Sequence, residues 1–303
     1  MEPMTATLTC VALACLAGQP ADAVTKKAGT ARLVEARSLV VEASTALESK
    51  EFTKAAELYV RAIEAGATSP TAAYNAVCCY AHLGRTDDAF KYLNVAIEKG
   101  WTDVERLDED TDLQPLREDE RWKEVASQCA AKRDEFRKSL GSPELYDELM
   151  RRMKFDQEAR NPVAPDVQAM QRVDPNNTAW TKEVLDKHGW PGFSLVGREG
   201  AQAAWLLVQH ADVDVGFQRW GLDQLTAAYE KGDATAADVA YLTDRVLVAE
   251  GKPQRYGTQF WTVDGELRPR PIEQEAEVDQ RRAEMGLEPM AVYAERMRSV
   301  YRK

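Results

Sequence analysis

Residues 55–66 read AAELYVRAIEAG, and residues 89–100 read AFKYLNVAIEKG. Ala55, Ala62 and Gly66 of the first segment thus recur 34 residues further along the chain. Small residues at helical spacing let two helices approach closely, and a glycine often ends a helix because it adopts the left-handed conformation at little cost. The repeated segment therefore predicts pairs of helices that stack on one another.

The 34-residue period resembles the tetratricopeptide repeat (TPR). The resemblance covers roughly residues 36–100, which is about two repeats, and an array of this kind usually needs three to be stable. We therefore expect the segment 107–125 to cap the array with its apolar side chains Leu113, Leu116, Trp122 and Val125. The resemblance implies an N-terminal domain at residues 31–141, made of two TPR-like repeats and capping helices, that recruits a protein or peptide partner.

The composition of the 303 residues excludes several classes of protein. The chain is 44% hydrophobic and 29% charged, so it can bury enough apolar surface for two domains. Its formal net charge is −11. Phosphate-rich partners attract clustered Lys and Arg, so this charge argues against nucleic acid or an anionic membrane surface as the main partner.

The first residues have the pattern of an export signal. Residues 8–17 are an apolar run too short to span a bilayer, and Ala21-Asp22-Ala23 resembles a cleavage site. We expect residues 1–23 to be a signal peptide and the mature protein to be periplasmic or secreted, although residues 1–7 lack the usual Lys or Arg. Two alternatives stay open: a lipid anchor on Cys15 of an exported lipoprotein, or an uncleaved helix in a cytoplasmic protein. No integral membrane segment is predicted.

A second domain is predicted at residues 142–303. Ser142-Pro143 has the pattern of a new helix start, with proline at the first helical position. Asp264-Gly265 between apolar residues predicts a short β-hairpin. The predicted fold class is therefore mostly all-α, with N-terminal helical repeats followed by a helical domain that contains one short β-hairpin. The helices predicted in this domain cover residues 144–160, 178–188, 198–211, 215–231, 235–250, 273–285 and 289–301.

The second domain carries a series of short polar motifs. In chain order they include Lys187-His188-Gly189-Trp190-Pro191, Gln209-His210-Ala211-Asp212, Tyr256-Gly257-Thr258-Gln259 and Val278-Asp279-Gln280-Arg281-Arg282. Together, over roughly residues 144–300, they resemble the uncharacterised bacterial family DUF6624. The resemblance implies that the motifs belong to one unit, and it implies no reaction.

Two of the chain's three histidines, His188 and His210, lie in these motifs and are candidate catalytic residues. Asp156 is the third candidate, because it continues an inward-facing stripe of apolar residues on the helix 144–160. An acid in that place either pairs with Arg160 or orients a histidine. The alternatives for the histidines are structural: His188 as a cation at a helix C-terminus, and His210 as a buried core residue.

Six further residues are candidates for binding a polar ligand. Arg198 begins a helix between two glycines, where free backbone amides favour an anion. The complete set of predicted ligand-binding residues is Arg160, Arg198, Gln209, Asp244, Tyr256 and Gln259. No cofactor and no metal site is predicted, because the chain has neither a paired-histidine helix motif nor a Cys-x-x-Cys motif.

Two functions remain open on these residues. In the first, the C-terminal domain binds a small polar or anionic ligand, or a peptide, in a pocket lined by His, Gln and Asp, while the repeats recruit a protein partner. In the second, the domain is a hydrolase or transferase in which His210 or His188 is the general base, with Asp156 or Asp244 orienting it. No nucleophile with an adjacent base is visible in the sequence, which favours binding.

Overall fold

The computed structural model describes residues 25–160 and 165–301. The chain divides into two compact units, with the boundary between Ser139 and Leu140. Within the described residues the secondary structure is helical, apart from one two-stranded antiparallel sheet, which confirms the predicted fold class. No helix in this part of the chain is long and apolar enough to cross a membrane. The signal peptide predicted for residues 1–23 lies outside the described residues.

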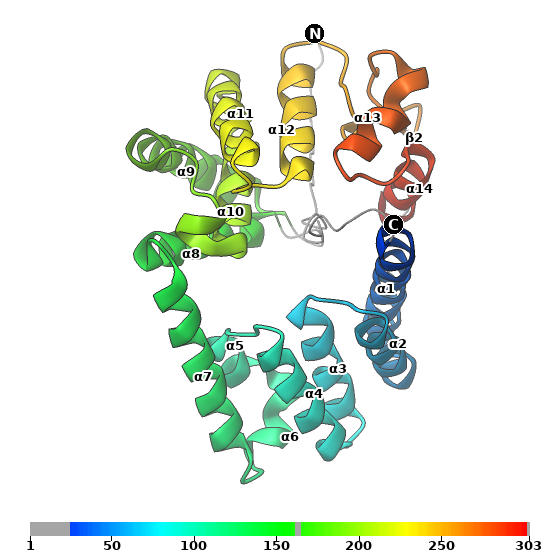
Figure 1. Cartoon of the computed structure of the whole chain (residues 1–303), viewed down its shortest axis with the longest axis vertical. Helices are drawn as coiled ribbons and strands as arrows, with labels where there is room; N and C mark the ends of the chain where they lie inside the picture. The colour runs from blue at the N-terminus through cyan, green and yellow to red at the C-terminus, as the bar shows by residue number, and fades with distance from the viewer. Residues whose placement is uncertain (1–24, 161–164, 302–303) are drawn as a thin grey trace. The chain divides into compact units, whose positions relative to one another are not determined.

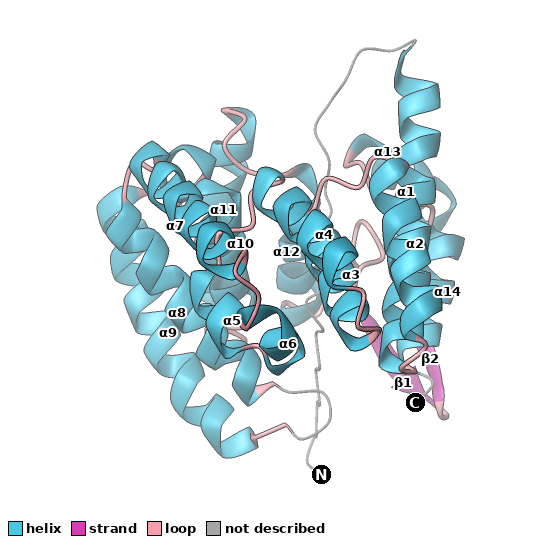
Figure 2. Cartoon of the chain, turned by 90° about the horizontal axis from the view of Figure 1, so that it is seen from below, coloured by secondary structure: helices cyan, strands magenta, loops and turns pink. Residues whose placement is uncertain are grey.

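The N-terminal unit is a succession of helices folded back on one another (Figures 1 and 2). Along this succession α1 packs against α2, α2 against α3, and α3 against α4. The elements are α1 (Thr25–Glu48), α2 (Phe52–Glu64), α3 (Pro70–His82), α4 (Thr86–Glu98), α5 (Val104–Glu109), the 3-10 turn η1 (Thr111–Leu113), α6 (Gln114–Arg117) and α7 (Trp122–Ser139).

The repeated segment forms α2 and α4, and its small residues lie where these helices contact their neighbours. Ala55 and Ala62 of α2 are fully buried, as are the corresponding Ala89 and Ala96 of α4. A larger side chain at any of these positions would push the helices apart. The apolar residues beyond the repeats, Leu107, Leu113, Leu116, Trp122 and Val125, are also buried in this unit.

The C-terminal unit is a helical assembly followed by the hairpin and two short helices (Figure 1). Its core consists of buried apolar residues from α8 to α12. The elements are α8 (Pro143–Ala159), α9 (Val167–His188), α10 (Phe193–Gln209), α11 (Val215–Glu230), α12 (Ala236–Ala249), β1 (Phe260–Val263), β2 (Glu266–Pro269), the 3-10 turn η2 (Glu275–Glu277), α13 (Val278–Glu284) and α14 (Met290–Tyr301).

Helix α9 begins at Val167, well before the predicted start at Thr178. The side chain of Asp166 caps it by accepting a hydrogen bond of 2.8 Å from the Ala169 amide. Pro175 lies inside the helix, which costs one backbone hydrogen bond but does not end it here. The longer helix matters for the site, because its first half carries Asp174.

Helix α10 begins at Phe193, whereas the prediction started it at Arg198. Asp233 provides acceptors for this first turn: its carbonyl accepts from the Phe193 amide at 3.1 Å, and its carboxylate accepts from the Ser194 amide at 2.7 Å. The helix is kinked at Gly197, whose φ of 69° is in the left-handed region. The first turn of α10 thus takes its acceptors from a distant part of the chain.

The predicted hairpin is present. Asp264 and Gly265 have φ values of 52° and 78°, as a two-residue turn of type I′ requires. Val263 pairs with Glu266 across the turn, and β1 and β2 are antiparallel.

Candidate functional site

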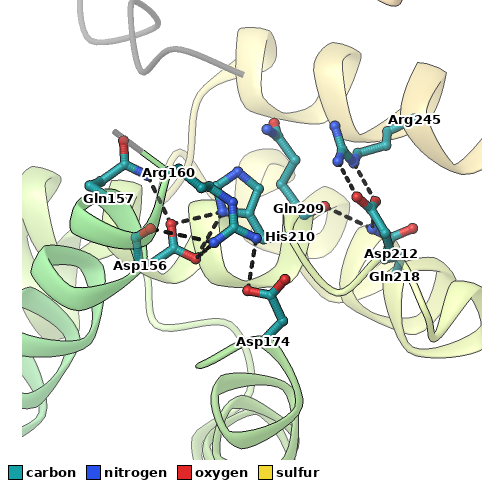
Figure 3. Close-up of polar contacts among 9 residues, drawn as sticks. All are labelled: Asp156, Gln157, Arg160, Asp174, Gln209, His210, Asp212, Gln218 and Arg245. Atoms are coloured by element: carbon teal, nitrogen blue, oxygen red, sulfur yellow. Dashed lines mark hydrogen bonds and ion pairs between the residues drawn. The ribbon is translucent and has the colours of Figure 1, made fainter. Parts of the chain in front are cut away.

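His210 follows the last residue of α10 and contacts Asp156 of α8 in the interior of the C-terminal unit. Its Nδ1 lies 2.8 Å from Oδ2 and 3.0 Å from Oδ1 of Asp156 (Figure 3). The exposed fractions of the two side chains are 4% and 1%. The sequence pattern that turned Asp156 inward thus brings it to one of the two candidate histidines.

Gln157 of α8 and Arg160, which follows α8, hold the Asp156 carboxylate in place, and Asp174 of α9 in turn binds Arg160. Gln157 Nε2 donates to Oδ2 at 2.8 Å, and Arg160 Nη1 donates to Oδ1 at 2.7 Å. The second terminal nitrogen of Arg160, Nη2, donates to Asp174 Oδ1 at 2.7 Å. Arg160 therefore bridges two carboxylates, and each of its terminal nitrogens has a carboxylate partner (Figure 3).

These contacts fix which nitrogen of His210 carries the proton. Both Asp156 oxygens already accept hydrogen bonds from N–H groups, so the bond to His210 requires an N–H on Nδ1. Burial lowers the pKa of His210, and the nearby Arg160 and Arg245 charges act in the same direction, although the bond to Asp156 opposes them. The imidazole is therefore neutral at neutral pH and has its lone pair on Nε2. Among the described residues, this buried Nε2 has no hydrogen-bond partner.

The lowered pKa of His210 predicts a loss of stability in mild acid. Above about pH 6.5 the imidazole is neutral in both the folded and the unfolded chain. Below that pH the unfolded chain takes up a proton first, because the folded-state pKa is lower, and the free energy of unfolding falls by up to about 1.4 kcal/mol per pH unit. Urea unfolding across this range should show the effect.

Two variants separate this effect from general acid destabilisation. The fall in the free energy of unfolding that His210 causes below about pH 6.5 should disappear in His210→Gln. It should persist in His188→Gln, since His188 is exposed. Equal pH profiles for all three proteins would mean that His210 titrates normally in the folded chain.

A second set of polar contacts fixes the backbone that follows α10. Arg245 of α12 donates through Nε and Nη2 to the two carboxylate oxygens of Asp212, at 2.8 Å and 2.5 Å. Burial opposes ionisation of Asp212, but the Arg245 charge and the hydrogen bonds from Arg245 and Gln218 together outweigh it, so the pKa of Asp212 is lowered. Gln218 of α11 donates through Nε2 to the Gln209 carbonyl at 2.8 Å and to Asp212 at 3.2 Å. The residues on both sides of His210 are thereby held in place.

The side chain of Gln209 is also unusual, because only 3% of the residue is exposed. Its amide makes no hydrogen bond to any residue that the structure describes, while its backbone carbonyl accepts from Gln218. Figure 3 shows the Gln209 amide on the far side of the His210 ring from Asp156. His210 Nε2 is fully buried and has no partner among the described residues, and such an atom costs free energy. Nε2, together with the amide of the preceding Gln209, therefore marks the place where a polar ligand would be stabilised.

Asp244 and Tyr256, two of the predicted ligand-binding residues, belong to a different set of polar contacts. The Asp244 carboxylate, which is fully buried, accepts backbone N–H bonds from Arg255 at 2.7 Å, Tyr256 at 3.0 Å and Thr258 at 2.9 Å. These contacts tie the loop after α12 to the helix. Burial raises the pKa of Asp244, against the effect of the backbone hydrogen bonds.

Gln259 belongs to the same loop. Its side chain donates to Thr258 Oγ1 at 3.1 Å, and its backbone amide donates to the side chain of Gln254 at 2.8 Å. The fully buried side chain of Gln254 also donates to the Gln259 and Arg270 carbonyls. The loop after α12 is thus anchored by the contacts of Asp244, Tyr256 and Gln259.

His188 and Arg198 lie apart from the Asp156–His210 pair. His188 is exposed at the C-terminal end of α9, 14 residues beyond Asp174, which corresponds to about 21 Å along the helix. Arg198 is exposed on α10, with its guanidinium 4.2 Å from the centre of the Phe193 ring.

Three residues that make polar contacts around His210, namely Asp174, Arg245 and Gln218, were not predicted from the sequence. Asp174 was overlooked because the helix was predicted to begin only at Thr178, although Asp166 with an apolar residue after it is a recognisable helix start. Arg245 and Gln218 lie on helices that were predicted well, but nothing in one sequence pairs them with Asp212 across helices.

Other hollows and polar groups lie elsewhere. Two surface grooves of about 440 and 450 Å³, the second lined partly by Lys182, Phe217 and Trp220, do not include His210.

Among the described residues one set of potential metal ligands occurs, Cys78 with Asp110 and Asp112 in the N-terminal unit. Burial and the nearby carboxylates raise the pKa of Cys78, so its thiol is protonated at neutral pH.

Residues 139–302 match the family of unknown function DUF6624, and this span is more than half of the chain. The chain is a member of DUF6624. The match confirms the resemblance found in the sequence motifs. The polar residues around His210, from Asp156 to Arg245, all lie within the DUF6624 span.

The N-terminal residues 36–137 match a second model, described as the N-terminal domain of A/B hydrolase-like proteins. No TPR family matches there. α/β-Hydrolases place their nucleophile at a turn between a strand and a helix, and the described residues of this span contain helices only. No curated protein and no solved structure matches the chain.

Proposed function

We propose that the DUF6624 domain binds a small polar ligand at His210 Nε2 and the Gln209 amide. The observation that carries the proposal is the buried Nε2 lone pair, which the Asp156 contact leaves unprotonated and for which the described residues offer no donor. A ligand donor at this nitrogen would remove the cost of an unsatisfied buried acceptor. The contacts of Arg160, Asp174 and Asp156 support the proposal, because they hold the imidazole rigidly in one orientation.

The proposal predicts a ligand-dependent difference between two histidine variants. A thermal-shift screen of the full chain with small amines, amides, amino acids, sugars and carboxylates should give compounds that raise the melting temperature. These compounds should act equally on His188→Gln and fail on His210→Gln, since only the second substitution removes the buried acceptor. Compounds that stabilise His210→Gln as well as the unsubstituted chain, or a screen without any stabilising compound, would count against the site.

General-base catalysis is the second candidate function, and the same pair favours it. A neutral imidazole whose Nδ1–H is bonded to a carboxylate is the arrangement by which His accepts a proton at Nε2. In a hydrolase or transferase of this kind His210 would deprotonate water or a substrate hydroxyl, and Asp156 would orient the ring and stabilise the imidazolium. Incubation of the full chain with the compounds that stabilise it separates the two functions: a general base should convert one of them to product, whereas a purely binding site should leave all of them unchanged.

For the N-terminal unit we propose that the helix pairs are TPR-like repeats that recruit a protein partner. The 34-residue period and the fully buried Ala55, Ala62, Ala89 and Ala96 support this. Cross-linking followed by affinity purification should recover a partner with the full chain and not with residues 140–303. A partner held equally by the shorter chain would contradict the proposal.

We further propose that the mature protein begins after Ala23 and is exported. The apolar run 8–17 and the small residues Ala21 and Ala23 support this. N-terminal sequencing of the protein from its native host should find Val24 first. An intact Met1 or Glu2 on protein in the cytoplasm would overturn the proposal.

A further inference from the structure

The charges around the proposed site restrict the ligand that it accepts. The polar cluster around the site contains three carboxyl groups, on Asp156, Asp174 and Asp212, and two guanidinium groups, on Arg160 and Arg245. The exposed fraction is 1% for the Asp156 side chain, 23% for Asp174 and 48% for Asp212, so solvent screens the Asp212 charge most. His210 itself is neutral, because burial lowers its pKa. The cluster therefore has one more acid than base, and a ligand with a negative charge would meet a repulsive field.

Two nitrogens of each guanidinium already donate to carboxylates of the protein. Nη1 and Nη2 of Arg160 donate to Asp156 and Asp174, and Nε and Nη2 of Arg245 donate to both oxygens of Asp212. Arginine binds carboxylates and phosphates best through two parallel N–H bonds. In both residues, a pair of N–H groups suited to an anionic ligand is already bound to protein carboxylates.

The atoms left for a ligand favour a donor. His210 Nε2 can only accept a hydrogen bond in the tautomer that Asp156 imposes. The amide of Gln209, the preceding residue, offers one acceptor oxygen and two N–H donors. We infer that the ligand presents an N–H donor without negative charge, in the form of an ammonium or amide group, to Nε2 of His210. This inference rests on the proposed function, since it names the ligand class of that same site.

The inference differs from the expectation that Arg160 and Arg198 contact an anion. Arg198 is exposed on α10, 12 residues before His210, which corresponds to about 18 Å along the helix. Anion binding at Arg198 would therefore be a separate event. An experiment has to read His210 and Gln209 directly, so that binding at surface cations is not mistaken for binding at the site.

The test is a nitrogen-15 NMR titration of the full chain with methylammonium, acetamide, acetate and inorganic phosphate. We expect methylammonium and acetamide to shift the His210 Nε2 and Gln209 side-chain resonances to saturation. Acetate and phosphate should bind there at least about tenfold more weakly, because like charges in a buried site repel. The two substitutions His210→Gln and Gln209→Leu should each weaken methylammonium binding, while Arg198→Gln should leave it unchanged.

The possible failures are distinguishable. If acetate or phosphate shifts the same two resonances with equal or higher affinity, the ligand class is wrong and the site survives. If none of the four probes shifts them, the proposed binding site itself is wrong. If phosphate shifts only resonances that depend on Arg198, anions bind elsewhere and the inference stands.

Discussion

The variant Asp156→Ala should lower the free energy of unfolding by about 3–5 kcal/mol, which is typical when one partner of a buried ion pair is removed. The substitution removes the acceptor of His210 Nδ1 and of Arg160 Nη1 at once, in a place where Asp156 is 1% exposed. Water cannot replace the lost acceptor without entering the core. Chemical denaturation of the full chain, fitted for the C-terminal unit, measures the change.

Two further variants define what the Asp156 result means. Asp223→Ala removes an exposed carboxylate from α11 of the same unit and should change stability by less than about 0.5 kcal/mol. Asp156→Asn keeps an oxygen for Arg160 and should cost less than Asp156→Ala. If Asp156→Ala were no more harmful than Asp223→Ala, the buried pair would not be part of the folded protein in solution.

The variant Asp244→Ala should be similarly harmful, with an expected loss of about 3–4 kcal/mol, because hydrogen bonds to a charged group contribute about 1.5–3 kcal/mol each and are not additive. Three backbone amides, those of Arg255, Tyr256 and Thr258, would lose their acceptor together. Hydrogen exchange should show these amides exchanging faster, while the amides in the middle of α10 remain protected. The result would identify Asp244 as an anchor of the loop.

The opposite outcome would support a ligand-binding role for Asp244. If Asp244→Ala left stability and amide protection unchanged, the carboxylate would be free for the ligand role that the sequence suggested. The exposed Asp223 again provides the reference for a harmless loss of a carboxylate.

Local patterns predicted the parts of the fold that depend on neighbouring residues. The hairpin follows from Asp264-Gly265, whose backbone angles suit few other residue pairs. The inward position of Asp156 follows from helical periodicity, because the residue lies on the same stripe as Leu145 and Leu149, which are also buried.

The parts that failed depend on contacts between distant segments. The first turn of α10 exists because Asp233, some 40 residues away, supplies its acceptors. Asp174 contributes to the site only because α9 continues through Pro175, which local preference disfavours. The i, i+4 spacing suggested the pair of Arg160 with Asp156, but nothing in the sequence pairs Arg160 with Asp174, which lies 14 residues further along the chain.

The central claim is that Asp156 holds His210 as the neutral tautomer with its proton on Nδ1. Nitrogen-15 NMR of the imidazole ring in the full chain tests it most directly, because protonated and unprotonated ring nitrogens resonate far apart. At neutral pH we predict a protonated Nδ1 and an unprotonated Nε2 for His210, and a reversal of the two in Asp156→Asn, whose amide would turn an N–H toward Nδ1. A protonated Nε2 in the unsubstituted chain, whether in the other neutral tautomer or in the imidazolium, would contradict the account.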